Sequence, residues 1–153
     1  MPSRPPKPAD SPWIAPYLAV SEVRQSIEFY ERAFGFSLLH TVEGPDNAPI
    51  HATLTYHEGM IMLGAEDRSK ELPRESLGHT PSSLGGSGLV LYAYAEDVDA
   101  LHARAVEAGA RVGFPPEEMW WGDRVCLLFD PDGHAWNFAT NLSDLPRMRP
   151  GGG

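Results

Sequence analysis

The sequence predicts an α+β fold built from two tandem βαβββ modules. One observation is the order of the elements, because a strand, a helix and three further strands are expected twice within the 153 residues. The other is the spacing of glycines: Gly109 follows Gly35 by 109 − 35 = 74 residues at the helix ends, and Gly133 follows Gly59 by 133 − 59 = 74 residues at the last hairpin turns. Equal offsets indicate a duplicated unit whose copies bury their apolar faces against each other.

The first module is expected over residues 12–66, after a proline-rich tail, residues 1–11, that we expect to be flexible. Its helix is expected over Glu22–Phe34, where apolar side chains recur at helical spacing, with Ser21 as the N-cap and Gly35 after the last turn. Apolar or alternating runs predict its strands at Trp13–Val20, Phe36–Val42, Ile50–Tyr56 and Met60–Ala65.

The second module is expected over residues 88–142, between a Ser-, Gly- and Pro-rich linker, residues 67–87, and a second flexible tail, residues 143–153. Its last hairpin turns at Asp130–Gly133, where an Asp, a Pro and a Gly occupy the positions that a tight turn requires. Periodicity predicts a helix at Glu96–Ala108, a loop at Pro115–Asp123, and strands at Gly88–Ala95, Arg111–Phe114, Arg124–Phe129 and His134–Thr140. Residues 12–142 are thus expected to form a single domain.

The acidic composition limits the partners of the chain. With a formal net charge of −9 and a pI near 5.0, the chain lacks the basic surface that nucleic acids and anionic membranes require, whereas a neutral or cationic small molecule is compatible. The one cysteine, Cys126, lies between apolar residues of a predicted strand, which predicts a buried and inert thiol. No stretch has the pattern of a signal peptide or a membrane span, so we expect a cytoplasmic location.

Three segments resemble the vicinal oxygen chelate superfamily, which includes glyoxalase I, extradiol dioxygenases, fosfomycin-resistance transferases and bleomycin-binding proteins. They are VRQSIEFYERAFGF, EDVDALHARAVEAGARV and FDPDGHAWNFAT, in this order. Within the superfamily, IHATLTYHEGMIMLGAED and WGDRVCLLFDPDGHAWNFAT are most similar to a poorly characterised bacterial branch related to phosphonate-cluster-associated proteins. The resemblance implies curved mixed sheets that are concave on the ligand side, helices on the outer side, and a homodimer.

The resemblance also implies where a metal would bind. Metal-dependent members place four His, Gln or Glu ligands on the concave face and leave open positions for a chelating substrate. The equivalent positions are Ala15, Met62, Leu89 and Asn137, and a shift of one residue at any of them supplies no better donor. We therefore expect no metal at the usual site and no cofactor. A displaced site remains open, and it would draw on His51, His57, His79 or His134.

If those four positions mark the concave faces, alternation along the strands extends a ligand pocket around them. An apolar and aromatic lining with a few polar groups is typical of a small-molecule site, although each side chain could instead serve ordinary packing. The expected lining comprises Trp13, Ala15, Tyr17, His51, Thr53, Met60, Met62, Leu89, Leu91, Val125, Leu127 and Asn137.

Trp120 and Trp121 lie in the loop before the last hairpin and are added to this pocket. Two adjacent side chains of an extended segment cannot both point inward, so one of them would cover the pocket mouth, where a planar or cationic ligand could stack, or a partner subunit. Packing in a dimer interface is the alternative. The neighbouring Asp123 and Arg124 could orient a ligand or form a surface ion pair.

Two functions compete on these grounds. The first is a metal-free small-molecule binding protein that resembles the bleomycin-resistance proteins and sequesters an antibiotic or a metabolite. The alternative is a glyoxalase-like lyase, isomerase or dioxygenase with a relocated or absent metal site, in which His51 is the candidate general base because histidine titrates near neutral pH. A third possibility is an interaction domain with a vestigial pocket. The sequence leaves open the identity of the ligand and whether the modules pair within one chain or between subunits.

Overall fold

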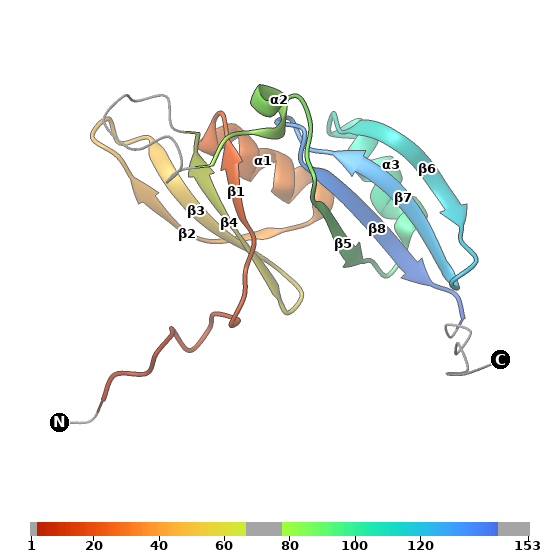
Figure 1. Cartoon of the computed structure of the whole chain (residues 1–153), viewed down its shortest axis with the longest axis horizontal. Coiled ribbons are helices and arrows are strands. Elements are labelled where there is room, and N and C mark those ends of the chain that lie inside the picture. Colours follow the sequence, from red (N-terminus) through yellow and green to blue (C-terminus); the bar gives the residue numbers. More distant parts are fainter. Residues whose placement is uncertain (1–2, 67–77, 144–153) are drawn as a thin grey trace.

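Each module forms its own four-stranded mixed sheet, with the strand orders β1-β4-β3-β2 and β5-β8-β7-β6 (Figure 1). The computed structural model of the chain describes residues 3–66 and 78–143. In each sheet the first strand of the module runs parallel to the last one, and the other pairs are antiparallel. The two tandem βαβββ modules that the sequence predicts are therefore confirmed as an α+β fold.

The elements follow the predicted order in both modules. The first module comprises β1 (Tyr17–Val20), α1 (Val23–Phe34), β2 (Ser37–Glu43), β3 (Pro49–Tyr56) and β4 (Gly59–Ala65). The second comprises β5 (Val90–Tyr94), α3 (Val98–Glu107), β6 (Arg111–Glu118), β7 (Asp123–Phe129) and β8 (Ala135–Asn141). A short helix, α2 (Pro81–Leu84), lies between them inside the predicted linker, with the Thr80 side chain as its N-cap.

Four local predictions are wrong. β1 begins at Tyr17 rather than Trp13, since Pro16 has no N–H to donate, although its carbonyl accepts from the Met62 N–H. Ser21 does not cap α1, whose N-cap is Glu22 and makes no side-chain capping bond. β6 continues through Pro115 and Pro116 to Glu118, because an edge strand tolerates missing donors. The linker is not structureless, because α2 forms in it; its residues 67–77 and the tail residues 144–153 lie outside the described residues.

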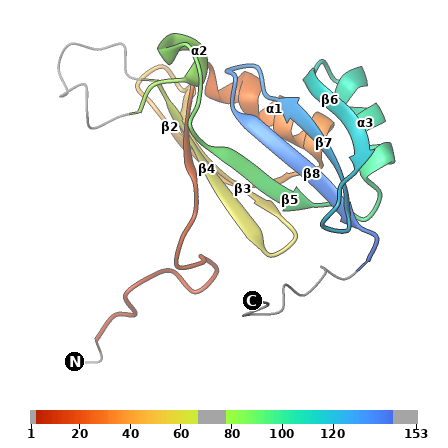
Figure 2. The same ribbon diagram turned by 45° about the vertical axis from the view of Figure 1, so that its right-hand side comes forward.

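One hydrophobic core joins the two modules. Helix α1 packs on one face of the first sheet and α3 on one face of the second, and the two helices contact each other (Figures 1 and 2). Tyr30 and Phe34 of α1 also pack against Trp136 and Phe138 of β8, with ring centroids between 4.7 and 5.8 Å apart. Within this chain the modules therefore pair with each other through α1.

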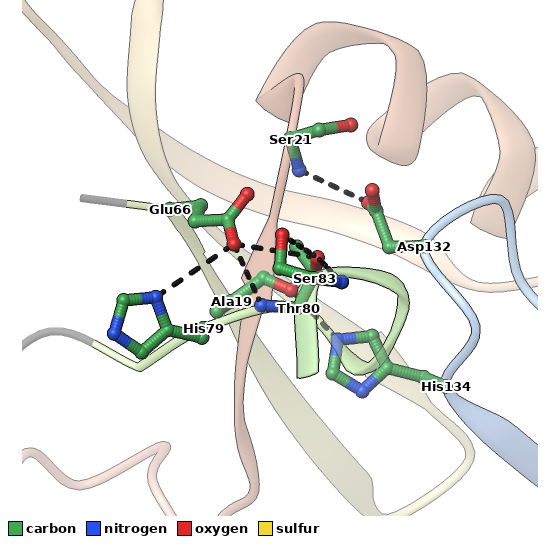
Figure 3. A network of polar contacts seen from close by, with 8 residues as sticks. All are labelled: Ala19, Ser21, Glu66, His79, Thr80, Ser83, Asp132 and His134. Carbon is green, nitrogen blue, oxygen red and sulfur yellow. Dashed lines mark hydrogen bonds and ion pairs between the residues drawn. The ribbon is translucent and has the colours of Figure 1, made fainter. Parts of the chain in front are cut away.

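The DPDGH turn of the last hairpin ties the second module to the first. As predicted, Asp130 accepts from backbone within the turn, through the N–H groups of Asp132 and His134. In addition, Asp132 accepts from the Ser21 N–H at 3.1 Å, and His134 donates to the Ala19 carbonyl at 2.7 Å (Figure 3). The turn that looked like a local hairpin signal is thus also an inter-module contact.

A buried polar chain continues from this turn into the core. Tyr30 donates to Asp130 at 2.8 Å and accepts from the Trp136 indole at 3.0 Å. Burial raises the pKa of Tyr30 well above its ordinary value, and the neighbouring Asp130 raises it further. Burial also raises the pKa of Asp130, so the hydrogen bonds that it accepts compensate a real desolvation cost.

The repeat is offset by 74 residues in one part and by 75 in another. Ala52 and Leu54 of β3 occupy the same core positions as Cys126 and Leu128 of β7, an offset of 126 − 52 = 74. In the flanking strands Tyr17 pairs with Met62 and Tyr92 pairs with Asn137, an offset of 92 − 17 = 137 − 62 = 75. The last hairpin is one residue longer in the second module, since Leu54 pairs with Ile61 whereas Leu128 pairs with Trp136. Aligning Gly59 with Gly133 is therefore wrong by one residue.

Candidate functional site

The sheet face that is turned away from the helix is called the open face of each module. In the first module, strand alternation places the core side chains of β1, β3 and β4 toward α1, so that their neighbours lie on the opposite side. The predicted pocket residues that meet on this open face are Tyr17, His51, Thr53, Met60 and Met62. His40 of β2 joins them and was not predicted.

A small polar cluster lies at the centre of the first open face. Thr53 is buried, and its Oγ1 lies 3.3 Å from Nε2 of His51 and 3.4 Å from Nε2 of His40. The ring of Tyr17 flanks that of His51, with centroids 5.7 Å apart. Partial burial lowers the pKa of His51, and the neighbouring His40 lowers it further, so the imidazole of His51 is neutral at neutral pH.

The open face of the second module carries Asn137, Val125 and Leu127, as predicted from alternation, since Cys126 and Leu128 between them point into the core. Val125 is buried and Leu127 half-buried. Asn137 donates its amide to the Cys126 carbonyl at 3.2 Å, so the position where metal enzymes carry a carboxylate is engaged with the sheet backbone. Two tyrosines of β5, Tyr92 and Tyr94, complete this face.

Those tyrosines correct the prediction for Leu89 and Leu91. Leu91 packs against the hydrophobic core, and Leu89 precedes β5 and is 58% exposed. The cause is the longer hairpin, because an offset of 75 residues makes Val90, rather than Leu89, the counterpart of Ala15. The four usual metal positions are thus Ala15, Met62, Val90 and Asn137, and none of them is a good ligand.

Asp123 organises the second open face. Its carboxylate is 3% exposed and accepts hydrogen bonds from the Tyr92 hydroxyl at 2.8 Å, the Tyr94 hydroxyl at 2.9 Å and the Asn141 amide at 2.8 Å. Burial alone would raise the pKa of Asp123, but the three donors outweigh it and the pKa lies below its ordinary value. Burial and the adjacent carboxylate raise the pKa of Tyr92 to about 12. The site therefore holds a fixed negative charge beneath two neutral tyrosines.

Arg124 does not neutralise this charge. It forms a two-pronged ion pair with Asp99 of α3, at 2.8 and 2.9 Å. The sequence left open whether Asp123 and Arg124 pair with each other; in the structure they do not, because neighbouring side chains of a strand point to opposite faces.

The two adjacent tryptophans have different roles. The indole of Trp121 donates to the Tyr92 hydroxyl at 3.1 Å, which fixes it beside the Asp123 cluster. Trp120 packs edge-on against Trp121, with centroids 5.5 Å apart, and is 80% exposed. Trp121 is therefore the one that faces the candidate site.

Two cavities border β5 where the modules meet. One of about 250 Å³ is mostly apolar and lies between β4 and β5, with Met60, Leu91 and Tyr92 in its wall and Ile14 of the N-terminal segment beside it. The other, of about 480 Å³, includes Tyr92 and Tyr94. Both strands turn free peptide groups toward this gap, since the Tyr94 carbonyl accepts from the Tyr56 hydroxyl across it.

The remaining predicted residues lie at the margin. Ala15 precedes β1 and is half-buried, and Trp13 is 78% exposed and is contacted by the Lys7 ammonium at 5.4 Å. Among the described residues, no group of three or more His, Cys, Asp or Glu side chains could hold a metal ion. The same part of the chain contains no helix long and apolar enough to cross a membrane.

The sequence missed the residues that organise both faces. Tyr92, Tyr94 and Asn141 act through Asp123, and their convergence depends on the pairing of β5, β7 and β8. The alternation of YAY with LVL in β5 was the available signal, had the repeat been aligned with an offset of 75. No comparable signal identified His40.

Paired βαβββ modules whose open faces carry aromatic and polar side chains define the vicinal oxygen chelate class of proteins. The chain belongs to the glyoxalase/bleomycin resistance protein/dioxygenase superfamily, whose sequence profile matches residues 12–138. It is 38% identical over 134 residues to uncharacterised proteins of Mycobacterium tuberculosis and Mycobacterium bovis; these residues are 88% of this chain and 77% and 86% of those proteins.

Solved structures share this fold. TioX from Micromonospora sp. ML1 superposes with a TM-score of 0.68 at 24% identity, over 86% of this chain and 100% of its own. TnmS3, an antibiotic binding protein from Streptomyces sp. CB03234, superposes with a TM-score of 0.56 at 25% identity, over 82% of this chain and 91% of its own. A glyoxalase-related enzyme from Fulvimarina pelagi gives 0.66 at 20% identity, over 84% and 87%.

Proposed function

We propose that the protein binds a small planar molecule, neutral or cationic, on the open face of the second module, without a metal at the usual four positions. The observation that carries this proposal is the Asp123 cluster, in which a buried carboxylate holds Tyr92 and Tyr94 in place, and Tyr92 in turn holds Trp121. Side chains that are already ordered lose little conformational freedom when a ligand binds. The cluster is therefore a preorganised aromatic surface.

The charge of this surface favours a cation. The Asp123 carboxylate is ionised and has no cationic side chain against it, because Arg124 is paired with Asp99. Tyrosine and tryptophan faces attract cations through the ring quadrupole, by about 0.5–2 kcal/mol each. The net charge of −9 adds long-range attraction for the same ligands.

The bleomycin-resistance type of function is the closest description of this role. TnmS3, at 25% identity and a TM-score of 0.56, is an antibiotic binding protein, which supports an antibiotic or a metabolite as the ligand. Antibiotic resistance, a cytoplasmic location and membership of the branch related to phosphonate-cluster-associated proteins remain predictions. The proposed binding mode requires no cofactor.

A homodimer would complete the site. Both open faces leave large side chains exposed, among them Tyr17 at 52% and Tyr94 at 56%. Exposed aromatic patches of this kind are typical of interfaces or ligand grooves. We propose that a second copy covers part of each open face and closes the ligand groove.

Titration of tryptophan fluorescence tests the proposed function, since Trp121 is part of the surface. A panel of planar cationic antibiotics and their neutral analogues is added to the full chain, and we expect at least one saturable change. Asp123→Asn removes the charge and should weaken the cationic ligand by about tenfold or more. Asp99→Asn, which removes the exposed carboxylate paired with Arg124, is the matched control and should bind normally. Flat traces across the whole panel would refute the proposal.

An enzyme of the glyoxalase-like type is the second candidate, and one observation favours it. His51 presents a neutral imidazole on the open face of the first module, as a general base requires. Turnover of a hemithioacetal or catechol panel that disappears in His51→Gln, while ligand binding at Trp121 persists, would replace the first proposal with this one.

A further inference from the structure

We propose that His40 and His51 form a two-imidazole site for a divalent transition metal ion, Zn²⁺, Ni²⁺ or Cu²⁺, on the open face of the first module. This site lies outside the four usual metal positions and on different strands from most of them. It goes beyond ligand binding at Asp123, which needs no metal and belongs to the other module.

A β-bulge assembles the pair. Leu38 of β2 pairs with the core residue Leu54, and after a register shift His40 pairs with Thr53, whose side chain points to the open face. Without the extra residue Leu39, His40 would lie on the same face as Leu38, because alternate residues share a face. Bulges often re-aim a side chain next to a functional site. Here the bulge brings His40 beside His51.

The two imidazoles converge through the same ring atom. Nε2 of His51 and Nε2 of His40 lie 3.3 and 3.4 Å from the same Thr53 oxygen, and the ring centroids are 6.1 Å apart. Neutral imidazole nitrogen is a preferred ligand of zinc, nickel and copper, with a bond of about 2.0–2.1 Å to zinc. Because His40 is exposed, its ring can turn toward His51. A metal ion held by both nitrogens would displace the two contacts with the Thr53 hydroxyl.

The surroundings define an open site rather than a structural one. No third His, Cys, Asp or Glu joins the pair among the described residues, so two imidazoles would occupy two positions of a four-coordinate ion. The other positions would face the open side of the sheet, next to Tyr17. Water, or a ligand with two vicinal oxygens, could fill them. The chemical class of ligand is therefore a metal chelator with neighbouring oxygen donors.

Isothermal titration of the tag-free full chain with ZnCl₂, NiCl₂ and CuCl₂ tests the site. We expect one equivalent of at least one metal to bind. His40→Gln and His51→Gln should each weaken binding by about tenfold or more, since each removes one of two ligands. His57→Asn is the control, because His57 lies in the β3–β4 turn with a φ of 49°, which asparagine tolerates.

Copper supplies a second readout that does not depend on affinity. The electron paramagnetic resonance spectrum of the one-to-one Cu²⁺ complex should show coupling to two imidazole nitrogens, reduced to one in His40→Gln. His40 is exposed, so this variant should keep the circular dichroism spectrum and the thermal midpoint of the parent chain. Absence of binding for all three metals, or equal loss in His57→Asn, would overturn the proposal. Fluorescence titration at Trp121 remains the separate test of ligand binding.

Discussion

In the first module the open face presents two histidines around a threonine, whereas in the second it presents two tyrosines around a carboxylate. The core faces of the same strands differ much less, since Ala52 and Leu54 correspond to Cys126 and Leu128. A core face is constrained by close packing, and a face open to ligand is not. The duplication therefore preserved the packing while the two modules acquired different chemistry.

The helices show a second asymmetry. α1 contributes large aromatic side chains to the shared core, whereas the buried residues of α3 are Val98 and Ala105. Because the two helices lie against each other, small residues on α3 leave room for the rings of α1. α1 is thus the element on which both sheets depend.

Truncation in the two helices should show this dependence most strongly. Phe34→Ala removes a ring that is 1% exposed and touches both modules, and should lower the free energy of unfolding by about 3–5 kcal/mol. Leu101→Ala in α3 removes a half-buried side chain and should cost only about 1–2 kcal/mol. Urea denaturation measures both variants, and equal losses would contradict the asymmetry.

The polar clusters should separate along the pH axis. Asp123 has a folded pKa below its unfolded value, so its stabilisation is present above the unfolded pKa of about 3.9 and is lost as the pH falls through the folded pKa. His51 also has a lowered pKa, so its contribution is present above about pH 6.5 and declines at lower pH.

Asp123→Asn should therefore flatten the acid limb of the stability curve, and His51→Gln the region between neutral and mildly acidic pH. At neutral pH Asp123→Asn should cost about 1–3 kcal/mol, because a charge-assisted acceptor for three donors is lost. Unfolding curves at closely spaced pH values measure both effects. Two variants with the same pH profile would mean that the clusters are not independent.

A contact between the helices should have a smaller effect. Arg104 of α3 donates to the carbonyls of Arg32 and Glu31, at 2.6 and 2.8 Å, near the C-terminal end of α1. Arg104→Ala should lower stability by about 1 kcal/mol, since the contact is exposed but joins the modules. Arg24→Ala, in the first turn of the same α1, should cost less. Thermal unfolding compares the two, and an equal shift would deny Arg104 an inter-module role.

The thiol should show no effect at all in the folded chain. Cys126 is fully buried, and burial raises its pKa to about 11, so the reactive thiolate is absent at neutral pH. Ellman's reagent should label it only after denaturation. Rapid labelling of the native protein would mean that β7 opens far more readily than its central position in the second sheet suggests.

Most of the fold was readable because periodicity and turn chemistry are local. Helix α1 ends at Gly35 with a φ of 76°, and the Asp130 turn forms as its residues require. The site was less readable. Tyr17, His51, Thr53, Met60, Met62, Val125, Leu127 and Asn137 lie on the predicted open faces, because alternation places them there. Leu89 and Leu91 do not, because one extra residue in the last hairpin shifts the repeat.

The sequence by itself determined the duplicated βαβββ order, the superfamily, and the absence of good ligands at the usual metal positions. Each of these depends on residue type and spacing along the chain. Only the tertiary structure decided that Asp123 gathers Tyr92, Tyr94 and Asn141, and that a bulge at Leu39 turns His40 toward His51. These residues lie on different strands, so strand register brings them together, and register responds to single-residue changes that a periodic pattern does not reveal.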